Sequence, residues 1–386
     1  MSANQTKYPQ LRFKGFTDPW EERKLGDEVR IVMGQSPNSK NYTDDPNDYI
    51  LVQGNADMKN GRVCPRVWTT QVTKQAEKDD LILSVRAPVG DIGKTAYDVV
   101  IGRGVAAIKG NEFIFQNLGK MKSDGYWTRY STGSTFESIN STDIKEAIIS
   151  VPAIEEQNKI GSFFKQLDNT IALHQRKLTK LKELKQGYLQ KMFPKNGAKV
   201  PELRFAGFAD AWEERKLGDE VRIVMGQSPN SKNYTDDPND YILVQGNADM
   251  KNGRVCPRVW TTQVTKQAEK DDLILSVRAP VGDIGKTAYD VVIGRGVAAI
   301  KGNEFIFQNL GKMKSDGYWT RYSTGSTFES INSTDIKEAI ISVPAIEEQN
   351  KIGSFFKQLD NTIALHQRKL EKLQELKKGY LQKMFC

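Results

Sequence analysis

The apolar residues of this chain follow two patterns, and each pattern occurs twice along the sequence. Between about residues 25 and 149, short β-branched runs are bounded by Gly, Pro, Asn and Asp, which is typical of strands joined by turns. Asn60 and Gly61 form the dipeptide of a hairpin turn. The candidate strands are residues 49–53, 81–85 and 105–109, and the candidate short helices are residues 113–123 and 142–147. This first pattern predicts a compact α/β domain with much irregular structure.

In the second pattern, apolar residues recur at alternating steps of four and three after Pro152, which is the heptad repeat of a coiled coil. Glu155 and Glu156 supply the acidic first turn of a helix. The heptad positions, called the seam below, are Ile160, Phe164, Leu167, Ile171, His174, Leu178, Leu181, Lys185, Tyr188 and Met192. The same register continues to Met384 in the second half, with seam residues Ile352, Phe356, Leu359, Ile363, His366, Leu370 and Leu373. A helix over residues 154–193 is roughly 60 Å long at ~1.5 Å per residue.

His174 and His366 interrupt the seam near the helix midpoints. The simpler interpretation is a partly buried, hydrogen-bonded residue that fixes the register. The alternative hypothesis is a contact that loosens when both imidazoles are protonated near pH 6. A melting temperature of the helix pair that stays constant between about pH 5.5 and 8 would exclude this alternative.

The chain is a tandem duplication. Residues 20–178 recur without a change as residues 212–370, an offset of 192 positions. The predicted divisions are a first globular domain over residues 1–151, a helix over 152–193, a linker over 194–200, a second globular domain over 201–343 and a second helix over 344–386. Two identical modules can pack about a two-fold axis, which requires the long helices to run antiparallel. If the partner is duplex DNA, modules related in this way would read the same bases on opposite strands.

Composition narrows the function only modestly. The formal charge of +8 fits a nucleic-acid partner. No apolar run approaches the roughly 18 residues of a membrane span, and the polar start lacks a signal peptide pattern, so we expect a cytoplasmic protein without a membrane partner. Three cysteines without a CxxC spacing and only two histidines predict neither a disulfide framework nor a metal site.

Short motifs in both patterns resemble those of the specificity subunits of Type I restriction-modification enzymes. In the helical part they are residues 149–152, 156–160, 167–171, 181–185 and 189–193. In the globular part they are residues 9–13, Trp20, residues 24–27, residues 34–37, and Gly133-Ser134-Thr135 ahead of Ile139. Their order, spacing and duplication make the resemblance specific, and it covers nearly the whole chain twice.

The resemblance implies an α+β protein with two globular target recognition domains, separated by a long antiparallel two-helix coiled coil with pseudo-two-fold symmetry. Each domain would read one half of a bipartite site in duplex DNA. The helices would set the gap between the halves and dock two methyltransferase subunits, and two restriction (motor-nuclease) subunits would complete the complex. S-adenosylmethionine, ATP and Mg would bind to these partners and not to this chain. Family members usually carry two different recognition domains, whereas identical domains imply an interrupted palindrome.

The chain carries no motif that predicts catalysis. The segment from Gly90 to Thr95 resembles a phosphate-binding loop, but only two residues separate its glycines, where the loop needs four. The stretch Gly102-Arg103-Gly104 lacks the strand, helix and acidic residue of a dinucleotide site, so a turn between strands is the better interpretation. We therefore expect a non-catalytic subunit of an adenine methyltransferase and endonuclease complex.

Candidate DNA-binding residues lie in loops rich in Arg, Asn and Gln, which read base edges, and in Lys, Ser and Thr, which contact phosphate. In the first copy they are Gln35, Ser36, Asn38, Ser39, Lys40, Tyr42, Asn55, Lys59, Asn60, Arg62, Arg86, Lys94, Ser134 and Thr135. In the second copy they are Gln227, Ser228, Asn230, Lys232, Asn247, Lys251, Arg254, Arg278, Lys286, Ser326 and Thr327. Two other functions remain open at this point: a stand-alone DNA-binding protein such as a repressor, and a coiled-coil scaffold that binds no DNA.

Inserting one heptad into each long helix is expected to widen the gap between the half-sites and to leave the half-site bases unchanged, because seven residues preserve the seam register. Sequencing methylated adenines in DNA from cells that carry the lengthened chain and its methyltransferase measures the gap. A change in the half-site bases would contradict the assignment of the helices as spacers.

Overall fold

A computed structural model describes residues 7–130, 138–195, 197–322 and 330–386 of the chain. The chain divides into two compact units. Unit 1 comprises Met1–His174 and Leu370–Cys386, and unit 2 comprises Gln175–Lys369. Each unit therefore contains one globular domain and parts of both long helices. The predicted α+β fold, with sheet-rich domains and long helices, is confirmed.

The elements of unit 1 alternate short strands with few helices, as the first sequence pattern predicts. They are β1 (Glu21–Lys24), α1 (Leu25–Glu28), β2 (Arg30–Met33), η1 (Ser39–Asn41), β3 (Tyr42–Thr43), β4 (Tyr49–Val52), η2 (Asn55–Asp57), β5 (Met58–Lys59), β6 (Arg62–Val63), β7 (Trp68–Thr69), β8 (Lys74–Ala76), β9 (Leu81–Ser84), β10 (Ile92–Lys94), β11 (Val99–Ile101), β12 (Val105–Lys109), α2 (Glu112–Ser123), η3 (Tyr126–Tyr130), α3 (Ser141–Lys145) and β13 (Ile148–Val151). The long helix α4 (Ile154–Met192) begins in unit 1 and ends in unit 2.

Unit 2 repeats these elements. They are β14 (Glu213–Lys216), α5 (Leu217–Glu220), β15 (Arg222–Met225), η4 (Ser231–Asn233), β16 (Tyr234–Thr235), β17 (Tyr241–Val244), η5 (Asn247–Asp249), β18 (Met250–Lys251), β19 (Arg254–Val255), β20 (Val259–Thr261), β21 (Gln267–Ala268), β22 (Leu273–Ser276), β23 (Ile284–Lys286), β24 (Val291–Ile293), β25 (Val297–Lys301), α6 (Glu304–Ser315), η6 (Tyr318–Tyr322), α7 (Ser333–Lys337) and β26 (Ile340–Val343). The long helix α8 (Ile346–Met384) begins in unit 2 and ends in unit 1. In the described residues, neither long helix nor any other helix combines the length and hydropathy that a membrane span requires.

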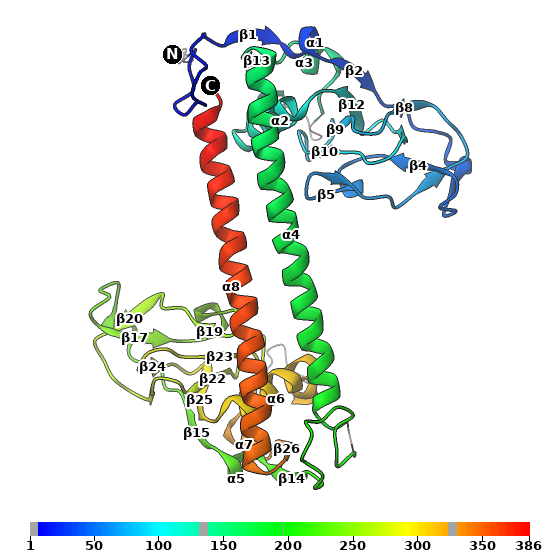
Figure 1. Ribbon diagram of the computed structural model, residues 1–386. Helices are drawn as coiled ribbons and strands as arrows, with labels where there is room; N and C mark the ends of the chain where they lie inside the picture. Colours follow the sequence, from blue (N-terminus) through cyan, green and yellow to red (C-terminus); the bar gives the residue numbers. More distant parts are fainter. Residues whose placement is uncertain (1–6, 131–137, 196, 323–329) are drawn as a thin grey trace. The chain divides into compact units, whose positions relative to one another are not determined.

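Two larger sheets and one small antiparallel sheet form each globular domain. In unit 1 the strand orders are β2-β12-β9-β10-β6-β5, β3-β7-β4-β11-β8 and β1-β13. The pairs β10–β6 and β11–β4 are parallel, whereas β9 pairs antiparallel with both β10 and β12. Figure 1 shows these strands beside the first turns of α4.

The central strands are buried on both faces. In β9, Leu81 and Leu83 face the helix-side core that includes α2 and α4, whereas Ile82 faces a second core that includes residues of the five-stranded sheet. In β12, Ala106 faces the first core and Ala107 the second. This alternation follows from the two-residue period of a strand, and it explains why these runs are apolar without interruption.

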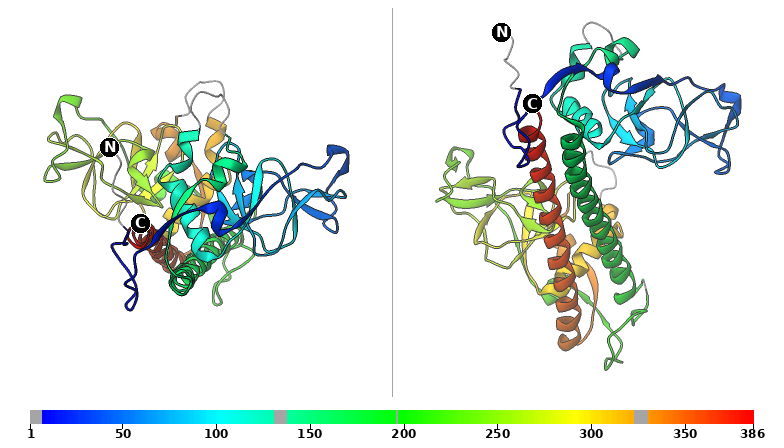
Figure 2. Two further views of the ribbon diagram at one scale, coloured as in Figure 1. Left: turned by 90° about the horizontal axis from the view of Figure 1, so that it is seen from above. Right: turned by 45° about the horizontal axis from the view of Figure 1, so that its top comes forward.

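Within unit 1, the end of α8 packs against the start of α4. The rings of Phe163 and Tyr380 lie 5.1 Å apart in an edge-to-face arrangement, and Lys377 forms a 2.6 Å ion pair with Asp168. Residue numbers rise along α4 as they fall along α8, so these segments run antiparallel. Both views in Figure 2 show the two segments side by side.

Unit 2 contains the equivalent contacts, between the end of α4 and the start of α8. Tyr188 and Phe355 lie 5.1 Å apart edge to face, and Lys185 forms a 2.7 Å ion pair with Asp360. The helix segments of unit 2 are therefore also antiparallel. The two-fold relation between the globular domains stays a prediction.

Burial along the long helices follows the heptad pattern. Every seam residue chosen from the sequence is buried or half-buried in both copies. Leu173 and Leu184, which lie outside the seam, are 58% and 47% exposed. Apolar character alone therefore does not determine which leucines are buried in these helices; heptad position does.

A buried ion pair ties the N-terminal segment of unit 1 to α4. Arg12 donates from Nε and Nη2 to the two carboxylate oxygens of Glu156, each at 2.7 Å, and Glu156 is fully buried. These hydrogen bonds raise the pKa of the Arg12 guanidinium above its ordinary value. The neighbouring Leu11 donates its backbone N–H to the carbonyl of Lys383, 2.8 Å away, in the last turn of α8. One segment thus satisfies a buried carboxylate and an otherwise unpaired helix carbonyl.

Replacing Arg12 with alanine is expected to lower the free energy of unfolding of unit 1 by about 3–5 kcal/mol, because the Glu156 carboxylate stays buried without its partner. Urea unfolding measures the loss, and amide hydrogen exchange locates it in unit 1. Arg23→Ala is the matched control, since the Arg23 and Glu21 side chains of that ion pair are 51% and 66% exposed and little change is expected. Equal losses in the two variants would contradict the role of the buried pair.

Candidate nucleic-acid interface

Unit 2 contains a cleft of about 540 Å³ on the strand-rich part of its globular domain. Polar residues dominate its lining, which includes two arginines and, as far as the structure describes it, neither a lysine nor a carboxylate. The lining residues are Ser228, Pro229, Asn230, Ser231, Tyr234, Gln245, Gly246, Asn247, Ser276, Arg278, Ala279, Arg295 and Gly296. The cleft is therefore suited to a polar or anionic ligand that offers hydrogen-bond acceptors.

Four chain segments meet at this cleft because of the strand pairing. Strands β17 and β24 are parallel, with Val244 opposite Ile293, so the segments that follow them leave from the same edge of the sheet. Gln245 follows β17, and Arg295 lies in the turn between β24 and β25. The other two segments follow β15 and β22.

Hydroxyl and amide groups of the lining hold these segments in place. The Ser228 hydroxyl accepts the backbone N–H of Arg295 at 3.1 Å, and the Asn230 side chain accepts the N–H of Lys232 at the same distance. The Ser276 hydroxyl donates to the carbonyl of Arg278 at 2.9 Å. These groups act within the protein and support the segments from which other side chains extend.

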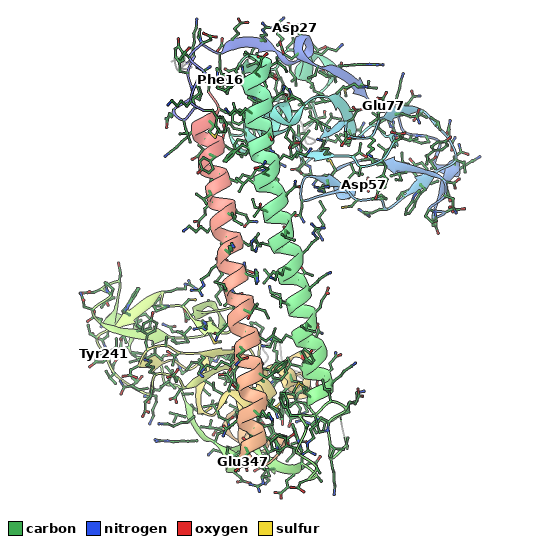
Figure 3. All side chains as sticks on the ribbon, in the orientation of Figure 1. Phe16, Asp27, Asp57, Glu77, Tyr241 and Glu347 are labelled. Atoms are coloured by element: carbon green, nitrogen blue, oxygen red, sulfur yellow. The ribbon has the colours of Figure 1, made fainter. Side chains whose placement is uncertain are left out.

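A buried carboxylate below the cleft anchors the segment after β17. Asp249 is 7% exposed and accepts the N–H groups of Gln245 and Gly246 at 2.8 and 3.2 Å. Its equivalent in unit 1 is Asp57, which is labelled in Figure 3 within the strand-rich part of that unit. Both carboxylates thus fix the backbone that carries a glutamine and an asparagine.

Two glycines allow the segments to approach one another. A Cβ atom at Gly226 would lie 2.1 Å from the carbonyl oxygen of Gly294, and one at Gly296 would lie 2.0 Å from that of Gln245. Backbone atoms occupy both spaces, so no larger residue fits without moving a segment.

Five polar side chains of the lining have no hydrogen bond or ion pair with any residue that the structure describes: Ser231, Gln245, Asn247, Arg278 and Arg295. Both arginines are exposed to solvent, whereas Gln245 and Asn247 are half-buried. Two guanidinium groups and two carboxamides are therefore available to a ligand.

The equivalent supporting hydrogen bonds occur in unit 1. Ser36 accepts the N–H of Arg103 at 3.1 Å, and the Ser84 hydroxyl donates to the carbonyl of Arg86 at 2.9 Å. Asp57 accepts the N–H of Gln53 at 2.8 Å. The equivalent side chains thus have the same supports in both units.

The structure brings together only some of the candidate residues chosen from the sequence. Those in the cleft lining of unit 2 are Ser228, Asn230, Asn247 and Arg278. Their equivalents in unit 1 are Ser36, Asn38, Asn55 and Arg86, and the candidates Ser39 and Tyr42 correspond to the lining residues Ser231 and Tyr234. Gln35 and Gln227 each accept a threonine hydroxyl through the backbone carbonyl, and neither Gln227 nor Lys232 belongs to the lining.

The remaining candidates lie elsewhere. Lys59, Asn60 and Arg62 belong to the β5–β6 hairpin, as Lys251 and Arg254 belong to the β18–β19 hairpin, and all five are exposed. Lys40 is also exposed, in η1. Ser134, Thr135, Ser326 and Thr327 lie outside the described residues.

Lys94 and Lys286 take part in a polar network instead of lining the cleft. Lys94 forms a 3.2 Å ion pair with Glu112 at the start of α2. Glu112 accepts a hydrogen bond from Gln116, which also donates to Asp168 of α4 at 2.8 Å. Since Asp168 is paired with Lys377, the network connects β10 to both helix segments of unit 1. Lys286 forms the equivalent pair with Glu304 in unit 2.

Sequence reasoning missed Arg103 and its equivalent Arg295. It placed Gln53 at the start of a candidate loop but did not choose it, or its equivalent Gln245, as a site residue. Arg103 lies 67 positions after Ser36, and only the parallel pairing of β4 with β11 brings its turn to the same sheet edge. In the sequence, Arg103 is flanked by two glycines. This pattern predicted a turn, but it did not predict that the turn lies beside the loop of Ser36.

No three His, Cys, Asp or Glu side chains of the described residues are placed to hold a metal ion. The fold and cleft define a class of protein: two α+β domains connected by long helices, with a polar cleft rich in hydrogen-bond donors in unit 2 and the same supporting hydrogen bonds in unit 1. The sequence profile of the Type I restriction modification DNA specificity domain matches residues 17–183 and 209–375. This chain belongs to that family and carries the domain twice.

Individual relatives agree with this assignment. The MjaX type I restriction enzyme specificity subunit of Methanocaldococcus jannaschii is 31% identical over 252 residues, or 62% of this chain and 59% of the relative. This chain thus spans about three fifths of the length of that relative.

Two solved structures share the fold. The Type-I restriction-modification system S subunit from M. genitalium is 16% identical, with a TM-score of 0.73 over 98% of this chain and 99% of the other. A chain from a study of complex assembly and conformational transition of the type I R-M system is 22% identical, with a TM-score of 0.53 over 95% of this chain and 97% of the other.

Asp249→Ala is expected to lower the free energy of unfolding of unit 2 by about 1–3 kcal/mol, because two backbone N–H groups lose a buried acceptor. Urea unfolding measures this change. The control is Asp236→Ala, which removes an exposed carboxylate with no hydrogen bond to the described residues and should have little effect. If Asp249→Ala were as stable as this control, the proposed anchoring of the segment after β17 would be wrong.

Proposed function

We propose that this chain is the sequence-specific DNA-recognition subunit of a Type I restriction-modification complex and has no catalytic activity of its own. The observation that carries the proposal is the cleft of unit 2, where guanidinium and carboxamide groups converge that have no partner, and no carboxylate beside them, among the described residues. These are the groups that contact base edges in DNA. Membership of the specificity domain family supports the same function.

Each globular domain is proposed to read one half of a bipartite site. Because residues 20–178 and 212–370 are identical, the two half-sites would have the same bases. An antiparallel pair of helices would present the domains to opposite strands, so that the full site is an interrupted palindrome. The antiparallel helix segments within each unit support this arrangement.

The long helices are proposed to dock two methyltransferase subunits, and two restriction subunits would complete the complex. Exposed leucines on α4 and α8 support a protein contact, since Leu173 and Leu365 are 58% and 57% exposed. S-adenosylmethionine, ATP and Mg would then bind to the partner subunits. The proposal that these cofactors bind to the partner subunits agrees with the absence of a catalytic motif from the sequence.

The test is to purify the chain with its methyltransferase and measure duplex DNA binding at several salt concentrations, then to sequence methylated adenines in cells that carry both proteins. We expect affinity to fall steeply with salt and a single interrupted palindrome to be methylated. A complex that binds no DNA would identify the chain as a scaffold.

Other outcomes separate the remaining alternatives. Tight DNA binding by a chain that never associates with the methyltransferase would identify a stand-alone DNA-binding protein. Two unlike half-sites would contradict the symmetric reading while preserving the recognition function.

A further inference from the structure

The polar side chains of the cleft fall into two groups with different tasks. The Ser228 hydroxyl joins two of the segments, and the Asn230 and Ser276 side chains form hydrogen bonds within their own segments. Arg278, Arg295 and the two carboxamides have no such bonds among the described residues. Among the described residues, the groups left for a ligand are therefore two guanidinium groups, two carboxamides and the Ser231 hydroxyl, with no lysine.

This choice of groups favours contacts with bases over contacts with phosphate. Phosphate oxygens accept hydrogen bonds from arginine, lysine, hydroxyl and amide side chains and from backbone N–H groups, so lysines and free hydroxyls would be expected to accompany the arginines in a phosphate site. The described residues of the lining include no lysine, and two of the three serine hydroxyls and one of the two asparagines are engaged within the protein. Arginine, asparagine and glutamine are the residues that make paired hydrogen bonds to base edges.

Arg295 extends from a closely packed turn. It lies between Gly294 and Gly296, in the turn that joins the buried strands β24 and β25. Its backbone N–H is held by Ser228, and contact with the segment after β17 leaves no room for a Cβ at Gly296. Because its backbone is already fixed, the planar guanidinium of Arg295 loses little conformational entropy when it binds two acceptors in one plane.

On the basis of the proposed function, we infer that Arg295, and Arg103 in the first copy, are specificity-determining residues that each recognise a guanine in their half-site. Guanine presents two acceptors, O6 and N7, in the major groove, which match the arginine fork. Adenine presents one acceptor and one donor there, and arginine has no acceptor for that donor. Each half-site would therefore contain at least one guanine, which would lie opposite the turn that carries Arg295 or Arg103.

The duplication provides an internal control, because one copy can be changed while the other stays intact. The test compares the wild-type chain with Arg295→Ala, with the double variant Arg103→Ala and Arg295→Ala, and with Arg295→Lys, each in complex with the methyltransferase. Arg222→Ala is the matched control, since Arg222 is an exposed arginine of β15 outside the cleft lining. Sequencing of methylated adenines gives the recognised motif, and competition binding with duplexes altered at one position gives the discrimination.

For Arg295→Ala, we expect one guanine position in one half-site to become degenerate, so that the palindrome turns into an asymmetric motif. Discrimination at that position should fall by roughly 5- to 150-fold, the range for loss of one paired base contact. The double variant should relax both half-sites and restore symmetry. Arg295→Lys should also lose discrimination, because a point charge cannot replace the fork, and Arg222→Ala should keep the wild-type motif.

Three outcomes would overturn the inference. The first is a uniform loss of affinity for all sequences with a salt slope reduced by about one, which is the result for a phosphate contact. The second is relaxation at a position that is not guanine, and the third is an unchanged motif in both alanine variants. Since the wild-type complex would still bind and methylate DNA in each case, these failures are distinct from a failure of the proposed function. Equal thermal unfolding of the variants and the wild-type chain verifies that the exposed arginine is not needed for folding.

Discussion

Each unit depends on an aromatic cluster that requires both copies of the repeat. In unit 1, Phe385 from the end of α8 stacks on Phe113 of α2, with ring centroids 5.1 Å apart, and meets Trp20 edge to face. Phe193 occupies the same position in unit 2, against Phe305. The first copy therefore does not complete its own core, because its terminal phenylalanine is buried in the unit that holds the second globular domain. Large aromatic side chains contribute much of the apolar area of a core, so this exchange makes the long helices part of both units.

This constraint explains why the junction between globular domain and helix is so closely packed. A Cβ atom at Gly161 of α4 would lie 2.9 Å from the Cβ of Glu112, so α2 sits directly on α4. Around this point, Asn111 donates to Gln157 at 2.9 Å, and Gln116 donates to Asp168 at 2.8 Å. Close backbone approach and paired polar groups fix the direction of a helix better than apolar contacts alone. The globular domain of each unit is thus held firmly to the helix segments beneath it.

Most of the fold could be predicted from the sequence, because local patterns determine it. The heptad steps predicted a helix over residues 154–193, and α4 covers Ile154–Met192. The candidate helices at 113–123 and 142–147 correspond to α2 and α3 within about two residues at either end. The pairing of β4 with β11 could not be predicted, since parallel strands are joined through long connections that leave no local signal. Arg103 was missed for this reason.

The ion pair of Lys94 could not be predicted from local patterns either. The charge and loop position of this lysine favoured a DNA contact, but Glu112, 18 positions later, pairs with it at the start of α2. An ion pair between residues so far apart depends on how β10 packs against α2, and charge patterning along the chain does not reveal it. By contrast, the four candidates of the second copy that do line the cleft, among them Asn247 and Arg278, lie in loops that directly follow apolar strands. Sequence reasoning therefore found the loops more reliably than the individual side chains.

The division between anchoring and free groups bears on how such a domain could change its target. Around the cleft, Ser228, Asp249 and Gly296 fix the backbone, whereas Arg278 and Arg295 extend from it without a hydrogen bond or ion pair to any described residue. Replacing an exposed side chain on a fixed turn alters few internal contacts, so it should cost little stability. Replacing an anchor would leave backbone N–H groups unsatisfied or force two segments apart. The residues that fix the backbone can thus stay the same while the exposed arginines and amides change. A change of recognised bases then requires no change in the helices or in the core that joins the two copies.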